Sequence, residues 1–246
     1  MSLLDIKNVS KSFGAVDVLR GIDLSIEAGS VTGLVGDNGA GKSTLMKTVT
    51  GIYTVDEGEV IFDGKPVTAL PPGERRALGI EMIYQDLALA SQQDVANNIF
   101  LGREPVKRLW GVIPGFVDKA LINEQAQQMI DRLGAKIPSI NRPVGQLSGG
   151  QQQSVAIARA LTFEPKLVIM DEPTAALAVR EVQHVLDLIT QLKNDGIAVI
   201  LISHRLNDIF EVCDRVVVLR QGHLIADTPR EQTSMNDVVS HIVGAA

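Results

Sequence analysis

A glycine-rich segment at residues 36–43 has the residue types and spacing that bind phosphate. It reads Gly-Asp-Asn-Gly-Ala-Gly-Lys-Ser, which matches the phosphate-binding loop pattern of Gly, four residues, Gly, Lys and Ser or Thr. Glycines let backbone N–H groups converge on phosphate oxygens, and a helix that follows presents its positive N-terminal end. The loop therefore predicts nucleotide binding, with contacts from Gly36, Asn38, Gly39, Ala40, Gly41, Lys42, Ser43 and Thr44.

Three side chains of this loop have distinct expected roles. Lys42 is expected to reach the β and γ phosphates and so to act in catalysis, Ser43 to hold Mg²⁺, and Thr44 to bond to a phosphate oxygen. An ordinary glycine-rich turn is the alternative, but the segment lies between a predicted strand and a predicted helix, as the mechanism requires. ATP with Mg²⁺ is the predicted ligand.

Two carboxylates follow an apolar run at residues 167–170. Asp171 and Glu172 lie at the C-terminal end of this predicted strand, where open α/β sheets bind their ligands. We expect Asp171 to orient Mg²⁺ and Glu172 to polarise an attacking water. The alternative is that both are merely acidic residues at a helix N-terminus. Together with the glycine-rich loop, the pair is typical of a P-loop NTPase.

The elements that must position these groups follow from apolar periodicity. Alternating apolar residues near the N-terminus predict a small antiparallel sheet, and short apolar runs predict buried strands at 31–35, 80–84, 167–170, 198–202 and 215–219. Helical spacing predicts helices at 42–49 and around 182–192, whereas residues 105–115, rich in Pro and Gly, are expected to form a loop. The predicted fold is α/β, with a nucleotide-binding core at 1–86 and 165–226, an inserted helical subdomain at 87–164 and a tail at 227–246.

The bulk composition narrows the class of protein. The chain has 246 residues, a formal net charge of -6 and nine aromatic residues, which argues against nucleic acid as a partner. No apolar run approaches the roughly 20 residues of a membrane-spanning helix, and the N-terminal residues do not read as a secretory signal. The expected location is cytoplasmic, with membrane contact only through a partner. Cys213, among valines, is expected to be a buried hydrophobe.

A third motif, Leu-Ser-Gly-Gly-Gln at 147–151, resembles the signature of the ATP-binding cassette (ABC) ATPases. Ser148, Gly149, Gly150 and Gln151 would open a helix and offer a hydroxyl and N–H groups to an anion. The resemblance covers nearly the whole chain and implies a RecA-like P-loop NTPase core. Family members usually carry Ser-Ala-Leu-Asp after the paired carboxylates, but this chain has Ala175-Ala176-Leu177-Ala178, with Ala178 in place of the Asp. This departure leaves open how the two sites of a dimer would communicate.

The resemblance implies further site residues. Phe13 and Val18 correspond to positions that contact adenine, although both are alternatively core residues of the first sheet. Gln85 matches a catalytic glutamine that senses Mg²⁺ and the γ phosphate, and His204 a switch histidine that contacts the γ phosphate. His184, His223 and His241 read as ordinary surface or core residues.

The same resemblance implies an assembly and a role. One copy of each motif predicts a dimer, expected to be a homodimer, in which the signature of one chain closes over ATP on the other. Further expected partners are transmembrane permease subunits on the inner face of the membrane and, indirectly, a periplasmic or extracellular sugar-binding protein. Several short stretches of the sequence resemble those of the ATPase subunits of ribose, xylose and fructose importers. The alternatives are an importer of different cargo, a soluble ABC ATPase without a transport role, and a module that binds ATP without hydrolysing it.

Overall fold

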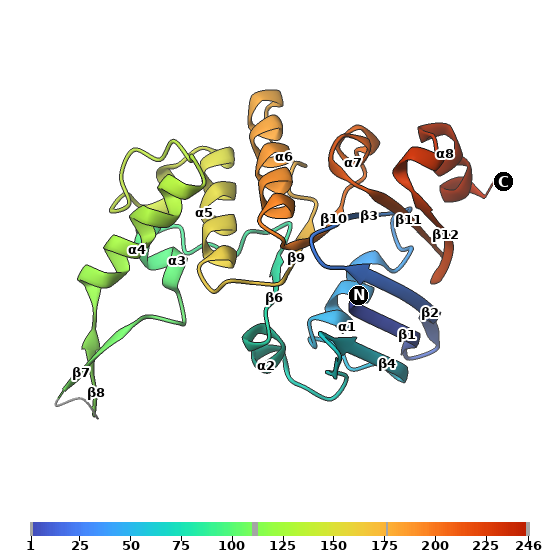
Figure 1. The fold of residues 1–246 in the computed structure, drawn as a ribbon, viewed down its shortest axis with the longest axis horizontal. Coiled ribbons are helices and arrows are strands. Elements are labelled where there is room, and N and C mark those ends of the chain that lie inside the picture. The colour runs from blue at the N-terminus through green and yellow to red at the C-terminus, as the bar shows by residue number, and fades with distance from the viewer. Residues whose placement is uncertain (1, 110–112, 176, 245–246) are drawn as a thin grey trace. The chain divides into compact units, whose positions relative to one another are not determined.

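The described part of the chain consists of two compact units, each held together mainly by contacts among its own residues. The structure is a computed structural model that describes the backbone of residues 2–109, 113–175 and 177–244 (Figure 1). Unit 1 comprises Met1–Gln85, Pro165–Ala175 and Leu186–Ala246, and unit 2 comprises Asp86–Glu164 and Ala176–Val185. Among the described residues, no helix combines the length and apolar character that a bilayer-spanning helix requires.

The first sheet of unit 1 is antiparallel, as predicted. Its strand order is β2-β1-β4-β5, formed by Val16–Glu27, Ser2–Phe13, Glu57–Phe62 and Lys65–Pro66. Buried side chains such as Leu4, Ile6 and Val9 give this sheet one apolar face.

The second sheet of unit 1 is mostly parallel and has the order β12-β11-β3-β10-β9-β6. Every residue of β3 (Val31–Val35), β6 (Ile80–Ile83) and β10 (Ala198–Ile202) is buried, which explains their mainly apolar sequences. β9 (Leu167–Asp171) is buried up to its last residue. β11 (Arg215–Arg220) is parallel to β3, and β12 (His223–Pro229) is antiparallel to β11. The predicted strands are thus confirmed to within one or two residues at their ends.

One apolar core joins both sheets of unit 1. Helix α1 (Lys42–Val49) contributes Leu45, Met46 and Val49 to a cluster that contains buried side chains of β1, β2, β3, β4, β9 and β10. Unit 1 also contains α2 (Pro72–Ala77), α7 (Leu206–Val212), η2 (Arg230–Gln232) and α8 (Met235–Val243). Cys213 is buried there, as predicted, and burial raises the pKa of its thiol.

Unit 2 is mainly helical but contains a hairpin where a loop was expected. Its helices are α3 (Val95–Phe100), α4 (Lys119–Arg132), η1 (Val144–Gln146) and α5 (Gly149–Leu161), and α3, α4 and α5 pack against one another. Helix α6 (Val179–Asn194) begins in unit 2 and ends in unit 1.

The prediction of a loop at 105–115 is wrong. β7 (Val106–Leu109) and β8 (Ile113–Val117) form an antiparallel pair, with Val106 opposite Val117. Gly111 lies outside the described residues. Pro and Gly near the turn hid the β-forming residues on either side of it.

A buried arginine fixes the end of the helix that follows the glycine-rich loop. Arg75 of α2 is 2% exposed, and its guanidinium donates to the carbonyls of Thr48 (2.6 Å) and Val49 (2.9 Å), in the last turn of α1. It also donates to the carbonyls of Leu70 (2.9 Å) and Thr68 (2.7 Å). Terminal carbonyls of a helix lack intrahelical partners, so this one side chain supplies donors to buried acceptors at this end of the helix. The Thr48 carbonyl also accepts from the N–H of Gly51 (3.2 Å).

We therefore expect Arg75→Met to destabilise the fold strongly. Each buried acceptor left without a donor costs about 1–3 kcal/mol, so the free energy of unfolding should fall by about 3 kcal/mol or more in a urea titration. Arg20→Met is the control, because Arg20 is an exposed arginine of β2. Its loss should cost less than about 1 kcal/mol. Equal effects of the two variants would contradict this role for Arg75.

Candidate functional site

The glycine-rich loop of unit 1 is packed so tightly that it needs glycine at two positions. At Gly36, with φ 152°, an added Cβ would lie 2.1 Å from the carbonyl oxygen of Leu219. At Gly41, with φ 106°, it would lie 2.9 Å from the carbonyl oxygen of Val18. At Gly39 nothing lies within 4 Å of such an atom. The loop is therefore held from behind by β2 and β11 and open at Gly39.

The basic side chain of this loop lies against its own backbone. Lys42 Nζ donates to the carbonyls of Gly36 (2.7 Å) and Asp37 (2.9 Å). Burial lowers the pKa of Lys42, while nearby Glu172 and Asp171 act in the opposite direction. Helix α1 begins immediately after Gly41, whose side chain cannot cap it. The N-terminal end of α1 thus presents positive charge with no capping side chain.

Asp171 lies at the end of β9 and faces the loop. Its Oδ2 accepts a hydrogen bond from the Ser43 hydroxyl at 3.2 Å. Burial raises the pKa of Asp171, partly offset by that hydrogen bond. A hydroxyl and a carboxylate side by side supply the oxygen ligands that Mg²⁺ prefers, and Mg²⁺ bound with nucleotide needs only one or two ligands from protein. The donor set fits that ion.

Glu172 has an unusual backbone conformation that places it beside His204. Its φ is 51°, and its N–H donates to the carbonyl of Ile202 at the end of β10 (2.9 Å). His204 Nδ1 lies 3.0 Å from Glu172 Oε2. A left-handed conformation in a residue other than glycine costs about 1–2 kcal/mol, and such strain is often found at functional positions.

A cavity of about 240 Å³ collects most of the predicted residues of unit 1. Lys42, Asp171 and Glu172 line it, together with the other residues Val18, Asn38, Gly39, Ala40, Gly41, Ser43, Thr44 and Gln85. Sequence positions 38–44, 85 and 171–172 thus converge, because β3, β6 and β9 all end at the same edge of one parallel sheet, and Val18 is added from β2 of the other sheet. Gly36 is not among the residues that line this cavity and packs against the backbone of Leu219.

Phe13 is not among the residues that line this cavity. It is 43% exposed, so it is not a core residue of the first sheet. Its ring contacts Tyr53 edge-on at 5.0 Å, with Lys11 Nζ 5.4 Å from its centre. Tyr53, which the sequence did not single out, thus forms an aromatic pair with Phe13 in which the Phe13 ring is exposed and Tyr53 is partly buried.

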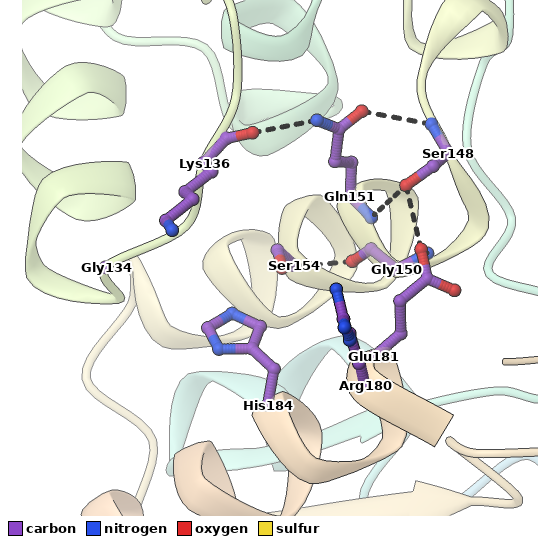
Figure 2. A pocket seen from close by; sticks show the side chains of 9 residues that line it. All are labelled: Gly134, Lys136, Ser148, Gly150, Gln151, Ser154, Arg180, Glu181 and His184. Atoms are coloured by element: carbon purple, nitrogen blue, oxygen red, sulfur yellow. Dashed lines mark hydrogen bonds between the residues drawn. The ribbon is translucent and has the colours of Figure 1, made fainter. Parts of the chain in front are cut away.

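The signature segment forms the N-terminal end of α5 in unit 2. Ser148 is the N-cap residue, and its hydroxyl accepts from the N–H of Gln151 (3.3 Å) while Gln151 Oε1 accepts from the N–H of Ser148 (3.0 Å). This reciprocal pair is a capping box. Gln151 Nε2 also donates to the carbonyl of Lys136 at 2.8 Å (Figure 2).

One residue that contacts the signature was not predicted from the sequence. Glu181 of α6 accepts from the hydroxyl of Ser148 (3.0 Å) and from the N–H of Gly150 (3.3 Å), and Figure 2 shows its carboxylate directed at Ser148. Its other oxygen accepts from the N–H of Ala178 (3.2 Å), the position of the missing family Asp. Ala176 lies outside the described residues. No sequence pattern pairs residues 148 and 181, so only the fold reveals this contact.

Comparisons with known proteins identify the family. The model of the family described as ABC transporter matches residues 19–175. The chain belongs to the ABC transporter family. Within this ABC family, the xylose/arabinose import ATP-binding protein XylG of Sulfolobus acidocaldarius is 44% identical over 96% of this chain and 92% of its own length. The ribose import ATP-binding protein RbsA of Yersinia pestis is 41% identical over 98% of the chain, which spans only 46% of that protein.

Solved ABC cassettes share the fold. A nucleotide-free ATP-binding cassette from an ABC transporter superposes with a TM-score of 0.85 at 31% identity, covering 98% of this chain and 96% of that one. A dimeric cassette in a post-hydrolysis state, bound to ADP and phosphate, has a TM-score of 0.78 at 26% identity, covering 92% and 98%. The predicted α/β fold with a P-loop NTPase core and an antiparallel β subdomain is confirmed, and the chain is an ABC-type ATPase that binds nucleotide.

The desolvated carboxylate of Asp171 leads to a prediction about stability. Its raised pKa means that the folded chain binds the Asp171 proton more tightly than the unfolded chain. The ionised group therefore opposes folding, fully so above the folded pKa and less as pH falls towards the unfolded value. Asp171→Asn should raise the free energy of unfolding at pH 7, by less than about 1 kcal/mol because solvent screens a half-buried group.

Urea titrations at pH 7 and at mildly acidic pH would measure this gain, which should shrink at the lower pH. Glu231→Gln serves as the control, because Glu231 is exposed in η2. A loss of stability in Asp171→Asn at pH 7 would show that the Ser43 bond outweighs desolvation.

Proposed function

We propose that this chain is the ATP-hydrolysing subunit of an ABC importer for a monosaccharide of the ribose, xylose or fructose type. The observation that carries the proposal is the 44% identity, over nearly the whole of both chains, to a xylose/arabinose import ATP-binding protein. The similarity to a ribose import ATP-binding protein supports the same cargo class.

The residues of the unit 1 cavity have different proposed roles in binding the phosphates and Mg²⁺. Backbone N–H groups of the glycine-rich loop and the N-terminal end of α1 hold the phosphates, and Lys42 exchanges its loop carbonyls for the β and γ phosphates. Ser43, Asp171 and Gln85 are the residues that would hold Mg²⁺, which neutralises charge on the phosphates when bound.

Glu172 is proposed as the group that polarises the attacking water. Its position at the end of β9, on the cavity wall, places a carboxylate next to the phosphate-binding loop. His204, 3.0 Å from Glu172, orients this carboxylate and is the proposed contact to the γ phosphate. Val18 on the cavity wall is the proposed adenine contact, and Phe13 with Tyr53 offers a neighbouring aromatic surface.

A complete site needs two copies of the chain. The N-terminal end of α5, with Ser148, Gly149, Gly150 and Gln151, offers donors suited to a phosphate held by a second copy. A dimeric cassette with ADP and phosphate is among the similar solved structures, which supports this arrangement. ATP then favours the closed pair by its higher affinity for that state, and hydrolysis releases the pair.

The remaining partners follow from the importer role. Transmembrane permease subunits couple closure of the dimer to movement of the sugar, and the ATPase lies on the cytoplasmic face of the membrane. An external sugar-binding protein delivers the cargo to the permease and does not contact this chain. The import names of the relatives support this assignment.

Replacement of Glu172 tests the catalytic assignment. Glu172→Gln keeps size and hydrogen bonding but removes the base, so ATP turnover should fall by about 10²–10⁴-fold while ATP binding persists. Steady-state phosphate release and equilibrium binding of a fluorescent ATP analogue would measure the two effects, with Glu231→Gln as a matched control. Turnover within twofold of the unmodified chain would overturn the assignment.

Reconstitution in vesicles tests the cargo. With its permease and sugar-binding protein, the chain should drive ATP-dependent uptake of a labelled pentose or fructose, and Glu172→Gln should not. Uptake of amino acids, lipids or metal chelates in place of sugar would show an importer of a different class. Failure to associate with any membrane subunit would favour a soluble ABC ATPase.

A further inference from the structure

A single carboxylate of unit 2 joins the N-terminal ends of two helices. Glu181 Oε1 accepts from the Ser148 hydroxyl and the Gly150 N–H at the start of α5. Glu181 Oε2 accepts from the N–H of Ala178, the residue just before α6. Both helices place partial positive charge at these ends, so the carboxylate lies where an anion is most stabilised.

The same donors are the ones proposed above to bind nucleotide phosphate. A hydroxyl has one hydrogen to donate, and a backbone N–H has one. The Ser148 hydroxyl donates its only hydrogen to Glu181, and its oxygen accepts from the Gln151 N–H. A phosphate oxygen can only accept, and it therefore cannot bond to Ser148 and Gly150 while Glu181 does.

The negative charge of Glu181 adds to this competition with phosphate for the donors of Ser148 and Gly150. The N–H of Ala178 and the hydroxyl of Ser148 lower the pKa of Glu181, so its carboxylate is ionised at neutral pH. Two anions at one set of donors repel each other. Glu181 borders a cavity of about 350 Å³ that is also lined by Lys136, Arg180 and His184, and Figure 2 shows these side chains around it. The cavity gives a displaced carboxylate room, with the cationic side chains of Lys136 and Arg180 in its wall.

We propose that Glu181 is an internal anion that occupies the signature donors in the separated chain and yields them to nucleotide phosphate when two copies close. The inference rests on the composite site proposed above. Closure then requires exchange of one anion for another, which raises the ATP concentration needed for closure. After hydrolysis and phosphate release, the carboxylate returns to its donors and favours separation.

The test is ATP-dependent dimerisation measured in the non-hydrolysing Glu172→Gln chain by analytical ultracentrifugation. Adding Glu181→Gln should lower the ATP concentration at half-maximal dimerisation by at least about twofold, because an anion at a helix N-terminus is worth about 0.3–1 kcal/mol, or about two- to fivefold per site. Glu181→Asp, whose shorter side chain keeps the charge but loses reach, should act in the same direction. Glu231→Gln added to the same parent should change nothing.

Two measurements separate the possible failures. Binding of an ATP analogue to dilute, monomeric protein reports on unit 1 and should be the same in all variants, and thermal melting shows whether each variant is folded. If the Glu172→Gln parent does not dimerise with ATP, the composite site itself is wrong. If the parent dimerises but the folded Glu181 variants need at least as much ATP for half-maximal dimerisation, the proposed exchange of Glu181 for phosphate is overturned. An ATP requirement higher than that of the parent would mean that Glu181 positions the donors for nucleotide.

Discussion

Backbone donors at the start of a helix need acceptors, and this requirement organises both functional segments of the chain. At α1 the first residues follow Gly41, which has no side chain to cap them, and they line an open cavity. At α5 the equivalent donors are engaged by the capping box of Ser148 and Gln151 and by Glu181. The N-terminal end of α1 is free to bind an anion, whereas that of α5 is already occupied by the Glu181 carboxylate. In the proposed mechanism, exchange of that carboxylate for nucleotide phosphate accompanies closure and release of the dimer.

The site of unit 1 carries local costs that the surrounding sheet must offset. Asp171 and Lys42 are both partly desolvated, and Glu172 has a left-handed backbone. The strands β3, β10 and β9 hold these residues in place, since each is buried along nearly its whole length. Arg75 adds to this by anchoring the far end of α1. The buried parallel sheet thus offsets the cost of the strained backbone at Glu172.

The parts that could be predicted from the sequence depend on local pattern. The strands at 31–35 and 198–202 and the helix at 42–49 were predicted because apolar runs and glycine spacing are short-range signals. Most of the cavity residues followed from motifs at the ends of such strands, whereas Val18 and Gln85 followed only from the family resemblance. Contacts between distant residues could not be predicted, as with Arg75 and the last turn of α1, or Ser148 and Glu181. The β7–β8 hairpin was missed for a different reason, because Pro and Gly signals outweighed a weak β pattern. The roles of Phe13, Gln85 and His204 remain predictions.

The central claim is that the active site is shared between two copies of the chain. The most direct measurement is the rate of ATP hydrolysis per chain as a function of protein concentration, with the oligomeric state followed in the same samples. A shared site predicts that the rate per chain rises with concentration in parallel with the dimer fraction. A rate per chain that stays constant down to concentrations at which only monomer is present would contradict the account.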